Sequence, residues 1–269
     1  MADKKFGFIG AGNMGGTLAA AATKAINAKD VYISDADSQK ATAFAENLGA
    51  VAVDNAKITE ECDYIFLGVK PQVLPCVLGD LADILKKRKD QPVIVSMAAG
   101  VSINAIEEII GIEMPVIRIM PNTPAAVGEG MVLYTHKNCS SEHIEGFLKA
   151  MSAVGGLDEI PEKLIDAGSA VSGCGPAFVY MFIEALADGG VECGLPYDKA
   201  LKYAAQTVLG SAKTVLETEK HPEALKNAVC SPGGTTIEGV HALEEGSFRA
   251  TAMNAVKAAY EKTLKLAGK

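Results

Sequence analysis

Strand-like runs alternate with helix-like runs through the first half of the chain, and this alternation limits the fold more than any other feature. Short apolar runs at 4–12, 30–35, 63–69 and 92–98 have the character of strands, and apolar residues at helical spacing lie between them. Strands that alternate with helices form parallel βαβ units, because a parallel pair needs a long crossover connection. The first half therefore predicts an α/β domain built on a parallel sheet.

The pattern changes near residue 160, where the strand-like runs stop and helical spacing continues. One helix is expected from Pro176, with Phe178, Met181 and Phe182 on its apolar positions, and a second is expected around Leu201. The apolar faces of this part are broad and rich in Ala, Val and Met, which is typical of helices that complete their core against a partner chain. We expect two domains, residues 1–160 and residues 161–269.

Composition excludes several classes of protein. The 269 residues are 49% hydrophobic and 22% charged, with a formal charge of −8 and scattered basic residues, so we expect a soluble globular protein that binds no nucleic acid. No apolar run approaches the roughly 18 residues of a membrane span, and no secretory pattern opens the chain, so we expect no membrane association and a cytoplasmic location. The six cysteines form neither a CxxC pair nor a zinc-like cluster, which predicts reduced, mostly buried thiols and no metal site.

A glycine motif, GAGNMG at residues 10–15, lies between the first strand and the first helix. Gly10 allows a tight turn, Gly12 allows the backbone to approach a pyrophosphate, and Gly15 allows close packing of the helix. The motif alone is weak, but its strand, turn and helix context favours a Rossmann dinucleotide site.

Asp35 ends the next strand, twenty residues after Gly15. In a Rossmann unit this carboxylate accepts hydrogen bonds from the adenosine ribose and favours NAD over a cofactor with a 2′-phosphate. The alternative is a helix-capping aspartate, since Asp35 and Asp37 precede a helical run. No arginine lies between residues 30 and 45, although Ser34, Ser38 and Lys40 could form a weaker phosphate clamp.

Two loops follow strand ends, where ligands of open α/β sheets bind, at residues 68–72 and 118–130. Prolines fix the shape of both loops. Asn122, between two of them, is a candidate to contact the nicotinamide, and an ordinary turn asparagine is the alternative.

Together these motifs resemble the Δ1-pyrroline-5-carboxylate reductase family, which catalyses the last step of proline biosynthesis. The similar segments extend over essentially the whole chain: FIGAGNMG, VKP, MPNTP, SGCGPAFVYMFIEALAD and VCSPGGTTIEGV. The resemblance implies an α/β Rossmann N-terminal domain followed by an all-α C-terminal dimerisation domain. It also implies reduction of 1-pyrroline-5-carboxylate to L-proline by NADPH or NADH, in a homodimer or a higher ring of dimers. Asp35 departs from the small, polar or basic residues that family members often carry there, which leaves the choice of cofactor open.

The loop CSPGGTT, residues 230–236, interrupts a helical region and suits an anionic substrate. Gly233 and Gly234 leave backbone N–H groups uncovered at the start of a helix, which predicts a site for the substrate carboxylate. Thr235 and Glu238 fit a capping box, so Thr235 is expected to cap the helix. Thr236 then lies at the first helical position and is the candidate catalytic donor to the imine nitrogen, which is also what the resemblance implies.

The remaining candidates complete the predicted site. Ser231 is expected to be a loop or ligand hydroxyl. Glu219 is a substrate contact by resemblance, and a solvated helix end is the alternative. His221 is expected to cap a helix C-terminus, and Cys230 is interpreted as a buried thiol. The full set predicted to contact the cofactor is Gly10, Ala11, Gly12, Asn13, Met14, Gly15, Ser34, Asp35, Val69, Lys70, Pro71, Ala98 and Asn122.

Two other functions are alternatives to this one. One is a β-hydroxyacid-type dehydrogenase or another imine dehydrogenase, which would have a similar layout. The β-hydroxyacid dehydrogenases place a catalytic lysine on the first long helix of the second domain, whereas residues 164–198 of this chain contain no Lys, Arg or His. A non-catalytic nucleotide-binding regulator would not require the 230–236 loop.

Overall fold

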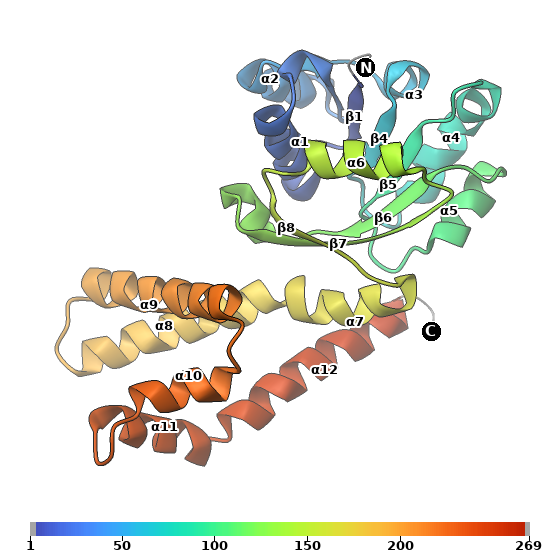
Figure 1. The fold of residues 1–269 in the computed structure, drawn as a ribbon. Helices are drawn as coiled ribbons and strands as arrows, with labels where there is room; N and C mark the ends of the chain where they lie inside the picture. The colour runs from blue at the N-terminus through green and yellow to red at the C-terminus, as the bar shows by residue number, and fades with distance from the viewer. Residues whose placement is uncertain (1–3, 267–269) are drawn as a thin grey trace. The chain divides into compact units, whose positions relative to one another are not determined.

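The computed structural model describes residues 4–266, which form two compact units (Figure 1). Unit 1 extends to Cys174 and includes the chain again from Ala259, and unit 2 is Gly175–Ala258. Unit 1 is an α/β unit and unit 2 is helical, so the predicted fold class is confirmed.

Unit 1 contains one sheet of eight strands in the order β3-β2-β1-β4-β5-β6-β7-β8. The pairs from β3 to β6 are parallel, β7 is antiparallel to β6, and β8 is parallel to β7. The sequence did not anticipate this added edge of β7 and β8. The strands are β1 (Phe6–Ile9), β2 (Val31–Ser34), β3 (Val51–Ala52), β4 (Tyr64–Leu67), β5 (Val93–Ser96), β6 (Val116–Met120), β7 (Gly130–Lys137) and β8 (Gly155–Glu159).

Helices cover both faces of this sheet, because successive strand residues point to opposite sides. Phe8 and Phe66 pack on the face of α1, α2 and α6, whereas Ile65 and Leu67 pack on the face of α3, α4 and α5. The fully buried strands therefore read as continuous apolar runs. The helices are α1 (Asn13–Ala25), α2 (Ser38–Leu48), α3 (Asn55–Glu61), α4 (Leu74–Lys87), α5 (Ile103–Ile110), α6 (Ser141–Ala150) and α7 (Glu162–Ser172), with short 3-10 turns at Ala28–Asp30 and Thr123–Val127.

By packing, α7 is part of unit 1, although the sequence assigned residues from 161 onward to the second domain. Arg118 of β6 is buried and donates to Asp166 of α7 at 2.9 Å and to Glu162 at 3.3 Å. Glu162 also accepts from the backbone N–H of Ile103 at 2.8 Å. A buried charge is costly unless it is paired, so these contacts hold α7 to the sheet, and the compact units divide after Cys174.

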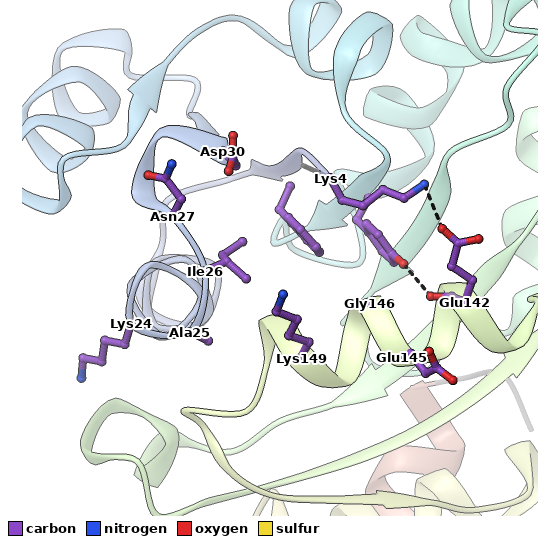
Figure 2. Close-up of a pocket in the computed structure, with 12 residues that line it drawn as sticks. Lys4, Lys24, Ala25, Ile26, Asn27, Asp30, Glu142, Glu145, Gly146 and Lys149 are labelled. Carbon is purple, nitrogen blue, oxygen red and sulfur yellow. Dashed lines mark hydrogen bonds and ion pairs between the residues drawn. The ribbon is translucent and has the colours of Figure 1, made fainter. Parts of the chain in front are cut away.

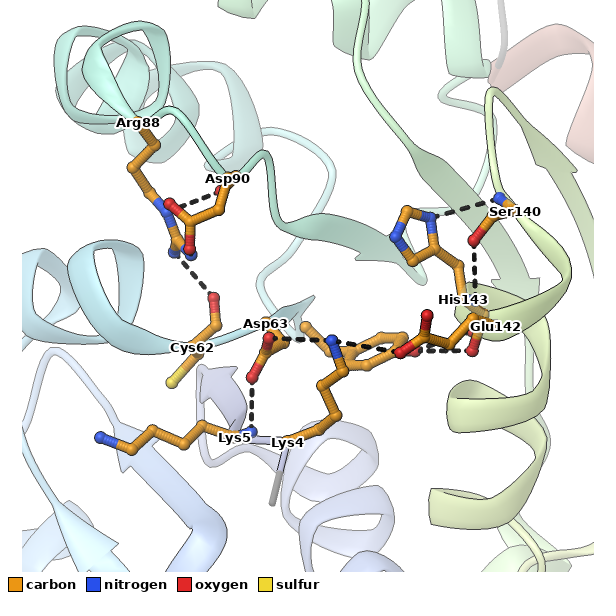
Figure 3. A network of polar contacts seen from close by, with 10 residues as sticks. Lys4, Lys5, Cys62, Asp63, Arg88, Asp90, Ser140, Glu142 and His143 are labelled. Carbon is orange, nitrogen blue, oxygen red and sulfur yellow. Dashed lines mark hydrogen bonds and ion pairs between the residues drawn. The ribbon is translucent and has the colours of Figure 1, made fainter. Parts of the chain in front are cut away.

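A polar network ties β1 and β4 to α6 at the edge of the sheet where these strands begin (Figure 3). The backbone N–H of Lys5 donates to Asp63 at 2.8 Å, and the Lys4 ammonium lies 3.4 Å from Asp63 and 3.5 Å from Glu142. Nearby, Arg88 donates to the carbonyl of Cys62 at 2.7 Å. The contact of Lys4 with Glu142 holds α6 beside the start of β1.

Unit 2 consists of helices that bury little of their apolar surface within one chain. Its buried apolar residues are Ala187, Ala200 and Ala204, at the contact between α8 and α9. Many larger side chains are exposed, among them Met181 and Leu216. The helices are α8 (Gly175–Glu192), α9 (Tyr197–Thr218), α10 (Pro222–Val229), α11 (Thr235–Glu245) and α12 (Phe248–Leu266), the last of which returns to unit 1 from Ala259.

Within residues 4–266, one segment, Glu162–Glu192, is long and apolar enough to cross a membrane by length and composition alone. No such segment was predicted from the sequence. A single such segment is weak evidence for a span, and the same exposure of apolar side chains is typical of a helix that packs against another protein chain.

Candidate active site

The glycine loop after β1 has the geometry that the motif predicts. Gly10 has φ +99°, and a Cβ there would lie 2.8 Å from the carbonyl oxygen of Gly68. A Cβ on Gly15 would collide with the carbonyl oxygen of Gly10, so α1 packs closely only with glycine at that position. Gly12 is the N-cap of α1, has no side-chain cap, and faces open space. The tight turn at Gly10 and the close packing at Gly15 are as predicted, and the contact of these glycines with a cofactor remains a prediction.

A cavity of about 820 Å³ lies beside this loop, at the edge of the sheet where the parallel strands end. A helix N-terminus and uncovered backbone N–H groups at such an edge suit the pyrophosphate of a dinucleotide. The Ser34 hydroxyl donates to Asn55 at 2.6 Å on the wall of this cavity. Six of the predicted cofactor residues line it: Gly10, Gly12, Ser34, Asp35, Val69 and Lys70.

Asp35 does not cap a helix. Its Oδ2 accepts from the backbone N–H of Ala11 at 2.8 Å and lies 3.7 Å from the Lys40 ammonium, and its Oδ1 accepts from the N–H of Asp37 at 3.1 Å. The cap of α2 is Asp37, whose side chain accepts from Gln39 and Lys40. Of the two interpretations of Asp35, the capping one is therefore wrong, and contact with a ribose remains a prediction.

Asn122 has a structural role in the described chain, and its predicted contact with the nicotinamide remains a prediction. Its Nδ2 donates to the carbonyl of Ser172 at 2.9 Å, and its Oδ1 accepts from the N–H of Met131 at 2.9 Å. The amide is 8% exposed. It joins β7 to the end of α7, and the second Nδ2 hydrogen and the second Oδ1 lone pair are not used by these two bonds.

The other predicted cofactor residues are spread around the same edge. Ala11 and Asn13 line a smaller cavity of about 340 Å³ on the α1 side, together with Gly12 and Lys40. Ala98 is buried just after β5. Met14, Pro71 and Ala98 are not among the residues that line either cavity, so their contact with cofactor remains a prediction.

Asp54 and Asn55 were missed by the sequence reasoning. Asp54 caps α3 by accepting from the N–H of Lys57 at 2.7 Å, and both residues line the larger cavity. They follow β3, which has only two residues and gave no strand signal. The dipeptide Asp-Asn after VAV was the available sign, because Asp and Asn favour helix starts.

In unit 2, residues 230–234 form a compact turn between α10 and α11. The N–H of Gly234 donates to the carbonyl of Ser231 at 3.0 Å, across Pro232 and Gly233, and Gly233 has φ +66°. Proline followed by a glycine with positive φ is the pattern of a type II turn. The backbone conformation therefore favours glycine at position 233, whereas a Cβ on Gly234 would collide with the Ser231 hydroxyl oxygen, which is a side-chain atom.

The turn leaves the start of α11 without a side-chain cap. The N-cap is Gly234 and no side chain accepts from the first turn, so the capping box predicted for Thr235 and Glu238 is wrong. Thr235 and Thr236 are both exposed, at the first and second helical positions. The helix N-terminus therefore keeps unsatisfied N–H groups and two hydroxyls, which together can bind a carboxylate and donate a further hydrogen bond.

Three neighbours of the turn differ from expectation or remain predictions. His221 is the N-cap of α10, accepting from the N–H of Glu223 at 3.2 Å, and is not a C-terminal cap. Glu219 is exposed and ends α9 with φ +53°, and its contact with substrate remains a prediction. Cys230 is half-buried, and of the six cysteines only Cys62 is fully buried, so the thiols are more exposed than predicted. Burial raises the pKa of the Cys62 thiol to about 12.

A further cavity, of about 600 Å³, lies at the opposite edge of the sheet (Figure 2). Its lining includes Phe6 and Tyr64, the first residues of β1 and β4, Ile26 just after α1, and Lys149 of α6. The Tyr64 hydroxyl donates to the carbonyl of His143 at 2.9 Å, and burial raises its pKa. This cavity is separate from the glycine loop, which follows the other end of β1.

The fold and the glycine loop define the class: an NAD(P)-dependent oxidoreductase with a Rossmann unit and a separate helical unit. The family model for pyrroline-5-carboxylate reductase dimerisation matches residues 162–266, and a model described as NADP oxidoreductase coenzyme F420-dependent matches residues 5–100.

Full-length relatives identify the family. The pyrroline-5-carboxylate reductase of Methanosarcina acetivorans is 42% identical with 100% of both chains covered, and that of Escherichia coli is 40% identical with 98% of both covered. The crystal structure of Plasmodium falciparum pyrroline carboxylate reductase with NADP bound superposes with a TM-score of 0.86 at 34% identity, covering 100% of both chains. The chain belongs to the pyrroline-5-carboxylate reductase family.

Proposed function

We propose that this chain reduces 1-pyrroline-5-carboxylate to L-proline with NADPH or NADH, as the last step of proline biosynthesis in the cytoplasm. The observation that carries the proposal is the uncapped start of α11 behind the Ser231–Gly234 turn, in a chain that also has the dinucleotide loop of this family. A small imine with one carboxylate needs both an anion site and a nearby hydrogen-bond donor.

The α11 start supplies both groups from this chain. Backbone N–H groups beyond Gly234 bind the substrate carboxylate, supported by the positive end of the helix dipole. The Thr236 hydroxyl donates a hydrogen bond to the ring nitrogen, with Ser231 and Thr235 as further polar contacts and Glu219 as a contact implied by the family. The cofactor supplies a hydride to the ring carbon. The C=N electron pair would move to nitrogen, which would take up a proton from solvent, so a hydrogen-bond donor there is worth most as the hydride arrives.

We propose that both cofactors are used. The wall of the larger cavity offers Asp35 to a ribose hydroxyl, which favours NADH. Lys40 lies 3.7 Å from Asp35 and partly offsets its charge toward a 2′-phosphate, which supports NADPH. The relative from Plasmodium falciparum has NADP bound.

The chain carries the family's dimerisation region, and we propose that the working form is a homodimer or a ring of dimers. The exposed apolar side chains of α8 and α9 support association with a second copy instead of a membrane. The negative net charge and the scattered basic residues support the absence of a nucleic-acid partner.

The test measures the oxidation of NADPH and of NADH with pyrroline-5-carboxylate as substrate and identifies the product. We expect oxidation that depends on pyrroline-5-carboxylate and yields L-proline, with no oxidation when a β-keto acid replaces the imine. Cofactor binding without turnover would favour a nucleotide-binding regulator. Turnover of other cyclic imines, with pyrroline-5-carboxylate inert, would favour a different imine reductase.

A further inference from the structure

The carboxylate of Asp35 contacts the glycine loop itself. Asp35 Oδ2 accepts from the backbone N–H of Ala11 at 2.8 Å, although the two residues are 24 positions apart. The Asp35 side chain is 18% exposed, and Ala11 is buried. A charged acceptor that is partly shielded from water makes a stronger hydrogen bond than a neutral one.

A second bond beside it sets the position of the loop relative to β2. The N–H of Gly10 donates to the carbonyl of Ser34 at 2.8 Å, so two successive N–H groups of the loop donate to two successive residues at the end of β2. The first bond needs only backbone and survives any side-chain change. The second exists only while residue 35 carries an acceptor of the right length.

We propose that Asp35 is a positioning residue that holds the glycine loop in the shape that binds the cofactor's pyrophosphate, whatever it does to the ribose. With Ala11 fixed, Gly12 and the first turn of α1 present their N–H groups toward the cavity at a set angle. The inference rests on the proposed function only in taking a dinucleotide as the ligand.

The negative charge of Asp35 weakens anion binding, whereas its hydrogen bond to Ala11 supports the loop that binds the anion. Substitutions can separate these two effects. A carboxylate beside a pyrophosphate site repels the anion, and Lys40, at 3.7 Å and half exposed, offsets only part of that repulsion. Replacing Asp35 by Asn removes the charge and keeps an acceptor for the Ala11 N–H. Replacing it by Ala removes both. The Asn variant also loses the bond to the Asp37 N–H, which lies outside the glycine loop.

The test uses full-length protein and a probe without ribose hydroxyls, 2′,3′-dideoxyadenosine diphosphate, with its Kd measured by calorimetry. Both variants lack the charge and the probe lacks the hydroxyls, so the variants differ in the amide of residue 35, and the exchange of the Ala11 N–H reports on its acceptor oxygen separately from its Nδ2 donor. We expect Asp35→Ala to bind the probe about tenfold more weakly than Asp35→Asn. Asp37→Ala is the matched control: it removes a nearby aspartate that caps α2 and should leave the Kd unchanged.

Equal Kd values of the Ala and Asn variants for the dideoxy probe would overturn the proposal. It would also be overturned if Asp35→Ala lost affinity for ADP but not for the dideoxy probe, because that result is expected of a residue that contacts only the ribose hydroxyls. Amide hydrogen exchange gives a second readout that needs no ligand. The Ala11 N–H should exchange faster in Asp35→Ala than in the parent or in Asp35→Asn, and unchanged exchange would contradict the inference. Neither measurement depends on turnover of pyrroline-5-carboxylate.

Discussion

Unit 1 and unit 2 differ in how much apolar surface each buries within a single chain. Unit 1 has two extensive cores, one on each face of its sheet, which contain large side chains such as Phe66 and Ile65. The buried apolar residues of unit 2 are three alanines, while Met181 is 70% and Leu216 is 79% exposed. Because burial of apolar surface drives folding, we expect unit 1 to be stable alone and unit 2 to depend on a second copy of the chain.

The largest effect is expected from a charge on the exposed apolar surface of unit 2. Met181→Asp should prevent assembly, because an unpaired carboxylate would be buried where two chains meet. Sedimentation velocity measures the loss. Ala43→Asp, at an exposed helical position of α2 in unit 1, is the control and should assemble normally. Normal assembly of Met181→Asp would show that this face is not an interface.

A core substitution in unit 1 should cost stability directly. Phe66 is fully buried and stacks on Phe8 with a centroid distance of 4.4 Å. Phe66→Ala should lower the free energy of unfolding of unit 1 by about 3–5 kcal/mol through lost burial and the cavity left behind. Denaturant unfolding at high protein concentration measures it. Leu216→Ala should leave the free energy of unfolding of unit 1 unchanged. If it lowered that free energy as much as Phe66→Ala does, the two units would not differ in how far their apolar residues stabilise a single chain.

The two threonines at the α11 start should affect the reaction and not the fold. Thr236→Ala should lower kcat on the order of tenfold to a thousandfold, as for loss of one catalytic hydrogen bond, and Thr236→Ser should retain much of the activity. Since Gly234 is the N-cap and no cap bond is made by a side chain, Thr235→Ala should change the free energy of unfolding by less than about 0.5 kcal/mol. If Thr236→Ala turns over at the parental rate, the donor is another group.

The smallest effect is a pH dependence at the α6 cap (Figure 3). The neutral His143 ring accepts from the N–H of Ser140 at 3.3 Å, and burial, aided by the nearby Lys4 charge, lowers the pKa of His143. The neutral form is favoured in the folded state, so this stability is complete above the ordinary pKa of about 6.5 and is lost as the pH falls through the lowered value.

His143→Gln keeps a capping acceptor that does not titrate. Between about pH 8 and pH 5 the parent should lose on the order of one or two degrees of Tm more than this variant. Parallel Tm curves for the two proteins would show that His143 does not carry the dependence.

Local rules predicted the fold and the glycine loop well. Alternating apolar and helical runs predict parallel strands, and the positions of Gly10 and Gly15 follow from backbone requirements that the motif encodes. Strand β8 was missed because its residues, GGLDE, are mixed, and its pairing with β7 is set by tertiary contacts. Strand β7 was missed although its sequence, GMVLYTHK, contains a strand-like apolar run.

The errors and omissions in the candidate site arise from hydrogen bonds between residues distant in sequence or from a choice between adjacent caps. The roles of Asp35 and Asn122 depend on Ala11 and Ser172, which no local pattern connects to them. Thr235 matches a capping box in sequence, but the turn held by Ser231 and Gly234 starts the helix one residue earlier. Likewise Arg118, which holds α7 in unit 1, finds its carboxylates 44 and 48 residues away.

Amide hydrogen exchange of the intact protein over a series of concentrations tests most directly whether the two units differ in their dependence on a second copy. The account predicts that protection of α8 and α9 falls as the protein is diluted, while the strands β1, β4 and β5 of unit 1 keep their protection at every concentration. A folded monomer in which α8 and α9 stay as protected as those strands would contradict it.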